Sequence, residues 1–87
     1  MDNKLQADIY ADIKSEENIV YNIVNVKKFV IYIFGYSNAI IIGRTTSNGE
    51  LNYDKVGSPN IEITTAQGAI GIKNGGAGTC NVRFVFM

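Results

Sequence analysis

Residues 29–44, FVIYIFGYSNAIIIGR, decide the fold expected of this chain. Ten of these sixteen side chains are large and apolar or aromatic, and no other stretch of the sequence is as dense. In residues 29–34 the odd and the even positions are both apolar or aromatic, so a strand here has two apolar faces. Both faces then need a cover, either from the chain itself or from a partner.

The composition favours strands over helices. The 87 residues are enough for one domain with one modest core, and they include thirteen Ile and seven Val against two Leu. β-Branched side chains lose rotamer freedom in a helix, whereas they fit well on the pleated surface of a sheet. We therefore expect a β-rich domain.

Charge and targeting signals limit the expected partners and location. Eight basic and eight acidic residues leave no formal net charge to concentrate phosphates or anionic lipids, so neither nucleic acid nor a membrane is an expected partner. The longest apolar run is shorter than the ~20 residues that span a bilayer, and the first ten residues lack the pattern of a secretory signal. A single cysteine, Cys80, forms no internal disulfide, so synthesis in the cytoplasm is expected.

Residues 1–18 are expected to form a polar N-terminal arm or a short helix ahead of a β domain at residues 19–87. Leu5, Ile9 and Ile13 recur at every fourth position, as in a narrow helical stripe, but apolar and polar residues also alternate here. No clear N-cap residue precedes the segment, which favours an extended arm that lays Ile9 and Ile13 on a neighbouring sheet.

The rest of the chain divides into short strands separated by turn-forming residues. Strands are expected at residues 19–26, 29–34, 39–42, 43–46, 50–53, 61–64, 69–72 and 80–86. Residues 35–38 supply turn formers, so residues 29–34 and 39–42 are expected to form an antiparallel hairpin. Asn48-Gly49 is the clearest turn signal and predicts a tight two-residue hairpin with residues 43–46 and 50–53 as partners, while residues 54–59 are expected to be a loop. About seven or eight such strands are typical of an all-β fold, either a small antiparallel sandwich or a barrel.

No pattern in the sequence indicates catalysis. Histidine is absent, which removes the commonest general base and excludes Ser-His-Asp and Cys-His sites. Cys80 is expected to face inwards as a small hydrophobic side chain, and the acidic residues near the N-terminus lack the ligand spacing of a calcium loop. The chain is therefore expected to be no enzyme, with no catalytic, cofactor-binding or metal-binding residues.

Two further features have a structural explanation. Lys27 and Lys28, just before the dense stretch, are expected to form a solvated turn or a guard against edge pairing rather than a ligand site. Residues 71–78 are rich in glycine but end in Gly78-Thr79 before a strand, whereas a phosphate-binding loop ends in Gly-Lys-Ser or Gly-Lys-Thr before a helix. We expect a wide hairpin loop there.

Residues 68–87, GAIGIKNGGAGTCNVRFVFM, combine a short strand, an Asn-Gly-Gly loop and an apolar closing strand. In this pattern, and in its small size, its Ile and Asn content and its polar N-terminal arm, the chain resembles the small β-rich virion proteins of tailed bacteriophages, especially head decoration (cement) proteins. The resemblance implies a capsid-surface protein that stabilises a phage head by clamping neighbouring shell subunits, often as a homo-oligomer. It transfers no functional residue to this sequence.

An excess of apolar surface is a separate, physical reason to expect association. A domain this small builds one core, yet residues 29–34 are apolar on both sides and residues 84–87 lack a charged gatekeeper. A second layer of the same chain would make a compact sandwich, whereas cover by another subunit would make the surplus an interface. The candidate interface residues are Ile9, Ile13, Val30, Tyr32, Phe34, Val85 and Met87.

The alternative function is a ligand-binding β module, such as a carbohydrate-binding or host-adhesion domain. Tyr36 and Tyr53, both expected in loops, would form its binding platform, because aromatic rings offer an apolar face with a polar tip. Loss of glycan binding in tyrosine variants that still fold would distinguish this module from an assembly protein.

Overall fold

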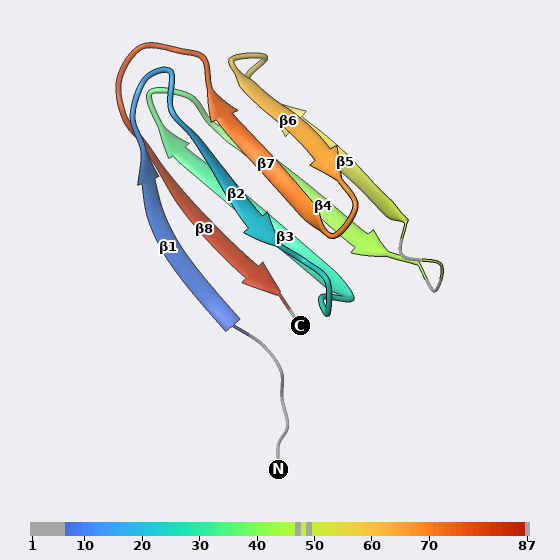
Figure 1. The fold of residues 1–87 in the computed structure, drawn as a ribbon. Coiled ribbons are helices and arrows are strands. Elements are labelled where there is room, and N and C mark those ends of the chain that lie inside the picture. Colours follow the sequence, from blue (N-terminus) through green and yellow to red (C-terminus); the bar gives the residue numbers. More distant parts are fainter. Residues whose placement is uncertain (1–6, 47, 49, 87) are drawn as a thin grey trace.

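Eight strands form two antiparallel sheets in the computed structural model, which describes residues 7–46, 48 and 50–86 (Figure 1). The strands are β1 (Ala7–Ile13), β2 (Asn18–Asn22), β3 (Lys28–Gly35), β4 (Ala39–Thr45), β5 (Leu51–Gly57), β6 (Ile61–Ala66), β7 (Ala69–Asn74) and β8 (Cys80–Phe86). The larger sheet has the order β1-β8-β3-β4-β5 and the smaller one the order β2-β7-β6. The all-β class predicted from the sequence is confirmed, and the two layers give it the arrangement of a sandwich.

The dense stretch folds as the β3–β4 hairpin. Val30 pairs with Ile42 and Ile31 with Ile41, which confirms the antiparallel partners expected from the turn residues between them. Gly35 has a φ of 126°, a conformation that glycine adopts without a steric penalty. Its N–H donates to Asn38 Oδ1 at 3.2 Å, so the polar turn residues close the hairpin that the apolar residues pack.

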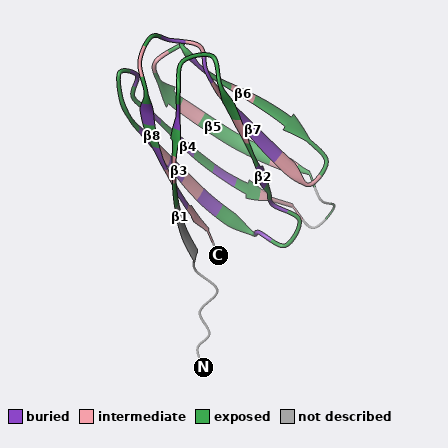
Figure 2. Cartoon of the chain, turned by 60° about the vertical axis from the view of Figure 1, so that its left-hand side comes forward, coloured by how far each residue is buried: buried purple, intermediate pink, exposed green. Residues whose placement is uncertain are grey.

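The core lies between the two sheets, and buried residues alternate with more exposed ones along the central strands (Figure 2). The buried side chains of β3 and β8 are Phe29, Ile31, Ile33, Cys80, Val82 and Phe84. The inward face predicted for the last strand, with Cys80 on it, is confirmed. Tyr21 of β2 stacks on Phe84 with ring centroids 4.3 Å apart, which ties the smaller sheet to the larger one.

The N-terminal arm is extended over residues 7–13. β1 pairs with β8 along its whole length, from Ala7 opposite Phe86 to Ile13 opposite Cys80. A helix at residues 7–13 is therefore the wrong alternative, because these residues are the edge strand of the larger sheet. Residues 1–6 lie outside the described part of the chain.

Two strand boundaries differ from those expected. The strand predicted at residues 19–26 ends at Asn22, whose Oδ1 accepts a hydrogen bond from Val24 N at 3.0 Å. This hydrogen bond stabilises a turn after Asn22, so the backbone no longer continues the hydrogen bonds between β2 and its neighbouring strand. The loop predicted at residues 54–59 is also wrong at its start, because Asp54 pairs with Ile42 and β5 continues to Gly57. Pro59, which has no N–H for a ladder, lies between β5 and β6.

The β4–β5 hairpin has the partners expected on either side of Asn48-Gly49. Gly43 pairs with Tyr53, and Thr46 N donates to Glu50 O at 2.8 Å. This register leaves three residues between Thr46 and Glu50, so the tight two-residue connection expected from the Asn-Gly signal is wrong in length. Residues 47 and 49 themselves lie outside the described part.

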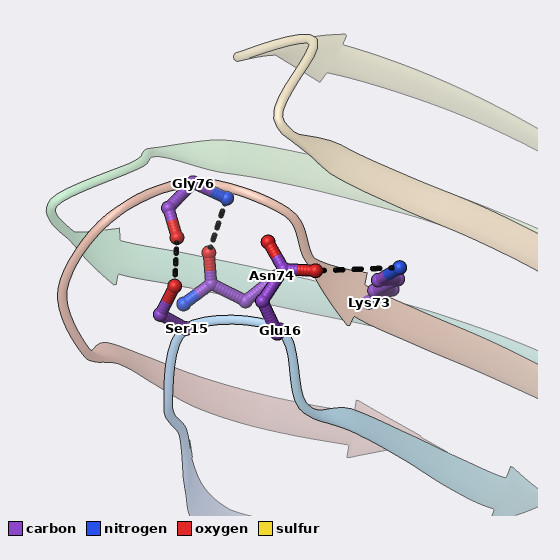
Figure 3. A network of polar contacts seen from close by, with 5 residues as sticks. All are labelled: Ser15, Glu16, Lys73, Asn74 and Gly76. Atoms are coloured by element: carbon purple, nitrogen blue, oxygen red, sulfur yellow. Dashed lines mark hydrogen bonds and ion pairs between the residues drawn. The ribbon is translucent and has the colours of Figure 1, made fainter.

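Asn74 organises the end of the sandwich where the glycine-rich segment lies (Figure 3). Its Nδ2 donates to Ile13 O at 3.0 Å and to Gly78 O at 2.9 Å, and its Oδ1 accepts from Gly76 N at 3.1 Å. Ser15 Oγ donates to Gly76 O at 2.7 Å, so the β1–β2 turn is tied to the same loop. The loop joins β7 to β8 in the other sheet, and the expectation of a hairpin loop is therefore wrong.

Candidate functional site

The register of the larger sheet aligns its outward side chains in rows across the strands. Tyr10 of β1 lies opposite Arg83 of β8, which lies opposite Tyr32 of β3. Tyr32 pairs in turn with Ile40 of β4, and Ile40 with Val56 of β5. We call Tyr10, Arg83, Tyr32, Ile40 and Val56 the central row. It crosses all five strands on the face that points away from the smaller sheet.

The central row is aromatic and basic at one end and aliphatic at the other. Tyr10 is 69% exposed and Val56 73% exposed, while Tyr32 and Arg83 between them are partly buried. The Arg83 guanidinium carbon lies 5.6 Å from the Tyr10 ring centroid and 5.9 Å from that of Tyr32. Each such cation–π contact is worth about 0.5–1 kcal/mol at an exposed site, so both rings help to position the guanidinium.

Neighbouring rows extend the apolar surface in both directions along the strands. On one side Val85 pairs with Val30, and Val30 with Ile42, which is 58% exposed. On the other side Phe34 is 51% exposed, and its ring stacks on that of Tyr32 with centroids 6.1 Å apart. We call this surface the outer face; it comprises Tyr10, Val30, Tyr32, Phe34, Ile40, Ile42, Val56, Arg83 and Val85.

An open depression of about 640 Å³ lies where the outer face meets the start of β3. Its lining residues are Lys28, Phe29, Val30, Ile42, Gly43, Arg44, Asn52, Tyr53, Asp54 and Val85. Side chains alternate along a strand, so only every second lining residue points to the outer face. On that face the apolar wall of the depression is formed by Val30, Ile42 and Val85, and its cationic rim by Lys28 and Arg44. The Phe29 ring packs on the other side of the sheet against Gly43, where an added Cβ would come within 2.3 Å of Phe29 Cζ.

The outer face contains four of the seven residues predicted for an interface: Val30, Tyr32, Phe34 and Val85. The prediction is wrong for Ile13, which is 1% exposed and belongs to the core because its parity in β1 points it inwards. Ile9 pairs with Phe84 through its backbone, but its side chain and Met87 lie outside what the structure describes.

Sequence reasoning missed five residues of the outer face: Tyr10, Ile40, Ile42, Val56 and Arg83. The run of apolar residues at 39–42 indicated a strand without showing which of its side chains would be covered. For Tyr10, Arg83 and Val56 the missing information was the pairing of strands far apart in the chain, which puts them in one row.

No family model, curated protein or solved structure matches this chain.

The two tyrosines expected to form the platform of a ligand-binding module lie on different elements. Tyr36 is exposed in the β3–β4 turn, where its ring lies beside Gly78. Tyr53 is in β5 and not in a loop. The β4–β5 ladder begins next to the β3–β4 turn with the pair Ala39–Gly57, and Tyr53 pairs with Gly43 four pairs further along. Four residues of strand measure about 13 Å, so Tyr53 lies about that far from the end of the ladder nearest the β3–β4 turn.

The titratable groups of the described residues show no arrangement typical of a reaction centre. Burial raises the pKa of the Tyr21 phenol, whose hydroxyl has no hydrogen-bond partner among these residues. Cys80 is buried, with its Sγ 3.5 Å from Ser37 O. Within residues 7–46, 48 and 50–86, no three His, Cys, Asp or Glu side chains are grouped as a metal site would need, and no helix is long and apolar enough to cross a membrane.

Proposed function

We propose that this chain is a non-enzymatic assembly protein that docks on subunits of a larger particle through its outer face. One observation carries the proposal: among the described residues, no element packs over the central row and its neighbours, and Tyr10, Ile42 and Val56 are all more than half exposed. The smaller sheet packs on the opposite face of the five strands and cannot cover them (Figure 2). Contiguous apolar patches beyond a few hundred Å² are rare on monomeric proteins and mark association surfaces.

The chemistry of the central row supports a protein as the partner. Tyrosine and arginine are the residues most enriched, with tryptophan, among those that contribute most to protein–protein binding. Arg83 is held between Tyr10 and Tyr32, so little side-chain entropy is lost when a partner covers all three. The balanced charge of the chain gives nucleic acid no comparable attraction.

The resemblance of residues 68–87 to head decoration proteins supports a phage head as the particle and neighbouring shell subunits as the partners. On this proposal the protein is a capsid decoration protein on the virion surface that stabilises the shell mechanically. This role requires neither catalysis nor a cofactor. Self-association on the shell, which the resemblance also implies, stays a prediction.

Binding to shells tests this proposal. The chain is mixed with empty shells assembled from the shell protein encoded by neighbouring genes, and the bound fraction is measured by co-sedimentation. Val56→Asp and Ile40→Asp place a charge in the central row, and we expect each to weaken binding at least about tenfold, because a desolvated charge replaces an apolar contact.

The matched control is Val20→Asp, which changes a similarly exposed valine of β2 in the smaller sheet. It should leave shell binding unchanged. The proposal is contradicted if the wild-type chain stays monomeric at tens of micromolar and does not sediment with shells. It is also contradicted if Val20→Asp weakens binding as much as Val56→Asp does.

A further inference from the structure

Two cationic side chains face each other at one end of the outer face. Lys28 of β3 pairs directly with Arg44 of β4, and both are exposed. Like charges directly opposite each other in neighbouring strands destabilise the pair of strands. Neither side chain forms an ion pair or hydrogen bond with another described residue. The sequence suggested that Lys28 guards a sheet edge against pairing. That interpretation is wrong, because β3 is a central strand.

The surroundings of this pair combine charge with an apolar wall. Val30, Ile42 and Val85 line the same 640 Å³ depression as the two cations. Asp54 also lines it, one row away from Arg44 and opposite Ile42. With two cations and one carboxylate around it, the depression keeps an excess of one positive charge.

A ligand for such a depression needs an anionic group and an aliphatic body. A guanidinium binds a carboxylate with two parallel hydrogen bonds, and a lysine ammonium adds a point charge beside it. The branched side chains of the wall bury the aliphatic part, at roughly 25 cal/mol per Å² of apolar surface removed from water. An inorganic anion would contact only the two cations of the rim, and the apolar wall would stay exposed to water.

We propose that this depression binds the carboxylate of a glutamate or aspartate in the partner protein, with aliphatic side chains beside that residue packed on Val30, Ile42 and Val85. The inference rests on the proposed function, because it names the chemistry of the partner segment that meets the outer face. Relief of the Lys28–Arg44 repulsion contributes to binding, so association is expected to weaken as salt concentration rises.

The test uses a small probe and does not need the partner. 4-Methylpentanoate is titrated into the labelled full chain, and backbone amide shifts are followed by NMR. We expect saturable shifts at Lys28, Val30, Ile42 and Arg44 with a dissociation constant in the millimolar range. The neutral amide of the same acid should bind about tenfold more weakly, because it lacks the charge that the rim recognises.

Two variants make the assignment specific. Lys28→Gln combined with Arg44→Gln removes both charges and should weaken binding of 4-methylpentanoate at least about tenfold. Lys14→Gln combined with Lys73→Gln removes two cations away from the outer face and should leave the dissociation constant unchanged.

Three outcomes overturn the inference. One is the absence of saturable shifts at these residues. Another is inorganic phosphate binding as tightly as 4-methylpentanoate, which makes the rim a general anion site. The third is the appearance of the same shifts on raising the protein concentration without probe, which makes a second copy of this chain the occupant.

The outcome for the probe is separate from the outcome for the proposed function. If 4-methylpentanoate does not bind but Val56→Asp still abolishes shell binding, the outer face docks and the carboxylate inference alone is wrong. If the probe binds but shells are not bound, the depression is an anion site on a protein with another function. Both results are read on variants confirmed to be folded by their amide spectra.

Discussion

Asn74 is the residue on which one end of the sandwich depends most. It is fully buried, and its amide makes three hydrogen bonds that join β1, the β7–β8 loop and its own strand. Asn74→Asp replaces two donated hydrogen bonds with a carboxylate oxygen facing the carbonyls of Ile13 and Gly78. We expect it to lower the free energy of unfolding by about 3–5 kcal/mol, because it buries a charge, of which one oxygen faces two carbonyls while only the other accepts a hydrogen bond.

Urea denaturation measures this effect. Asn25→Asp, at an exposed position between β2 and β3, is the matched control and should change the free energy of unfolding by less than about 0.5 kcal/mol. A loss below about 1 kcal/mol for Asn74→Asp would contradict the assigned role, because the amide would then not be the link between these segments.

Tyr21 carries a polar group into the core without a partner among the described residues. Its ring stacks on Phe84, so Tyr21→Phe keeps the packing and removes the unsatisfied hydroxyl. We expect the free energy of unfolding near neutral pH to stay the same or to rise by up to about 1 kcal/mol. A loss of more than about 1 kcal/mol, measured by urea denaturation, would show that the hydroxyl has a partner.

The same residue gives the protein a predicted alkaline limit. Burial raises the pKa of Tyr21 above its ordinary value of 10.0, which the unfolded chain has. The stability that this group provides is fully present below pH 10 and is lost as pH rises through the folded-state pKa, because unfolding then releases a proton. Tyr21→Phe should therefore lose less stability than the wild type between neutral pH and pH values above 10, which thermal unfolding across that range would show.

At the level of elements, β8 is central to both the sheet and the core. It pairs with β1 on one side and β3 on the other, and Phe84 contacts the rings of Tyr21, Phe29 and Phe86. We expect Phe84→Ala to cost about 3–5 kcal/mol of unfolding free energy, the sum of lost burial and a remaining cavity. Chemical denaturation is the measurement, and a cost below about 1 kcal/mol would contradict the placement of β8.

Phe34→Ala is the matched control for this substitution. Phe34 lies on β3 but points outwards and is 51% exposed, against 1% for Phe84. Its truncation should cost about 1 kcal/mol or less, since most of the ring is already in water. A cost equal to that of Phe84→Ala would mean that the outer face is covered within the isolated chain.

Sequence reasoning succeeded for elements that are specified locally. The β3–β4 hairpin and the inward face of β8 follow from alternation and from turn residues close to each strand. It failed at residues 54–57, because β5 is an edge strand whose residues are largely exposed and polar, so that part of it looks like a loop. It also failed after Asn22, where a single side-chain hydrogen bond ends the strand although the apolar run continues.

The candidate site was harder to predict than the strands. Val30, Tyr32 and Phe34 were found because one strand with two apolar faces is visible in the sequence. The central row joins residues as distant as Tyr10 and Arg83, and this neighbourhood depends on the order β1-β8-β3, for which no local signal exists. Parity within β1 also decided that Ile13 would be core and Tyr10 surface.

At the scale of the whole molecule, the apolar excess could be covered by a second layer of the same chain or by another subunit. These two possibilities apply to different faces of the larger sheet. The smaller sheet covers one face of the larger sheet and completes a core of aromatic and aliphatic side chains. Among the described residues no second layer covers the outer face, and its central row combines the exposed rings and the guanidinium typical of a protein interface. The smaller sheet thus completes the core, while we propose that the outer face meets a partner.

Hydroxyl-radical footprinting of the chain, free and bound to assembled shells, tests the central claim most directly. Tyr10 and Phe34 are on the outer face, and Tyr36 is exposed in the β3–β4 turn. We predict that shell binding protects Tyr10 and Phe34 from oxidation while Tyr36 remains as reactive as in the free protein. Protection of Tyr36 with continued oxidation of Tyr10 and Phe34 would contradict docking through the outer face.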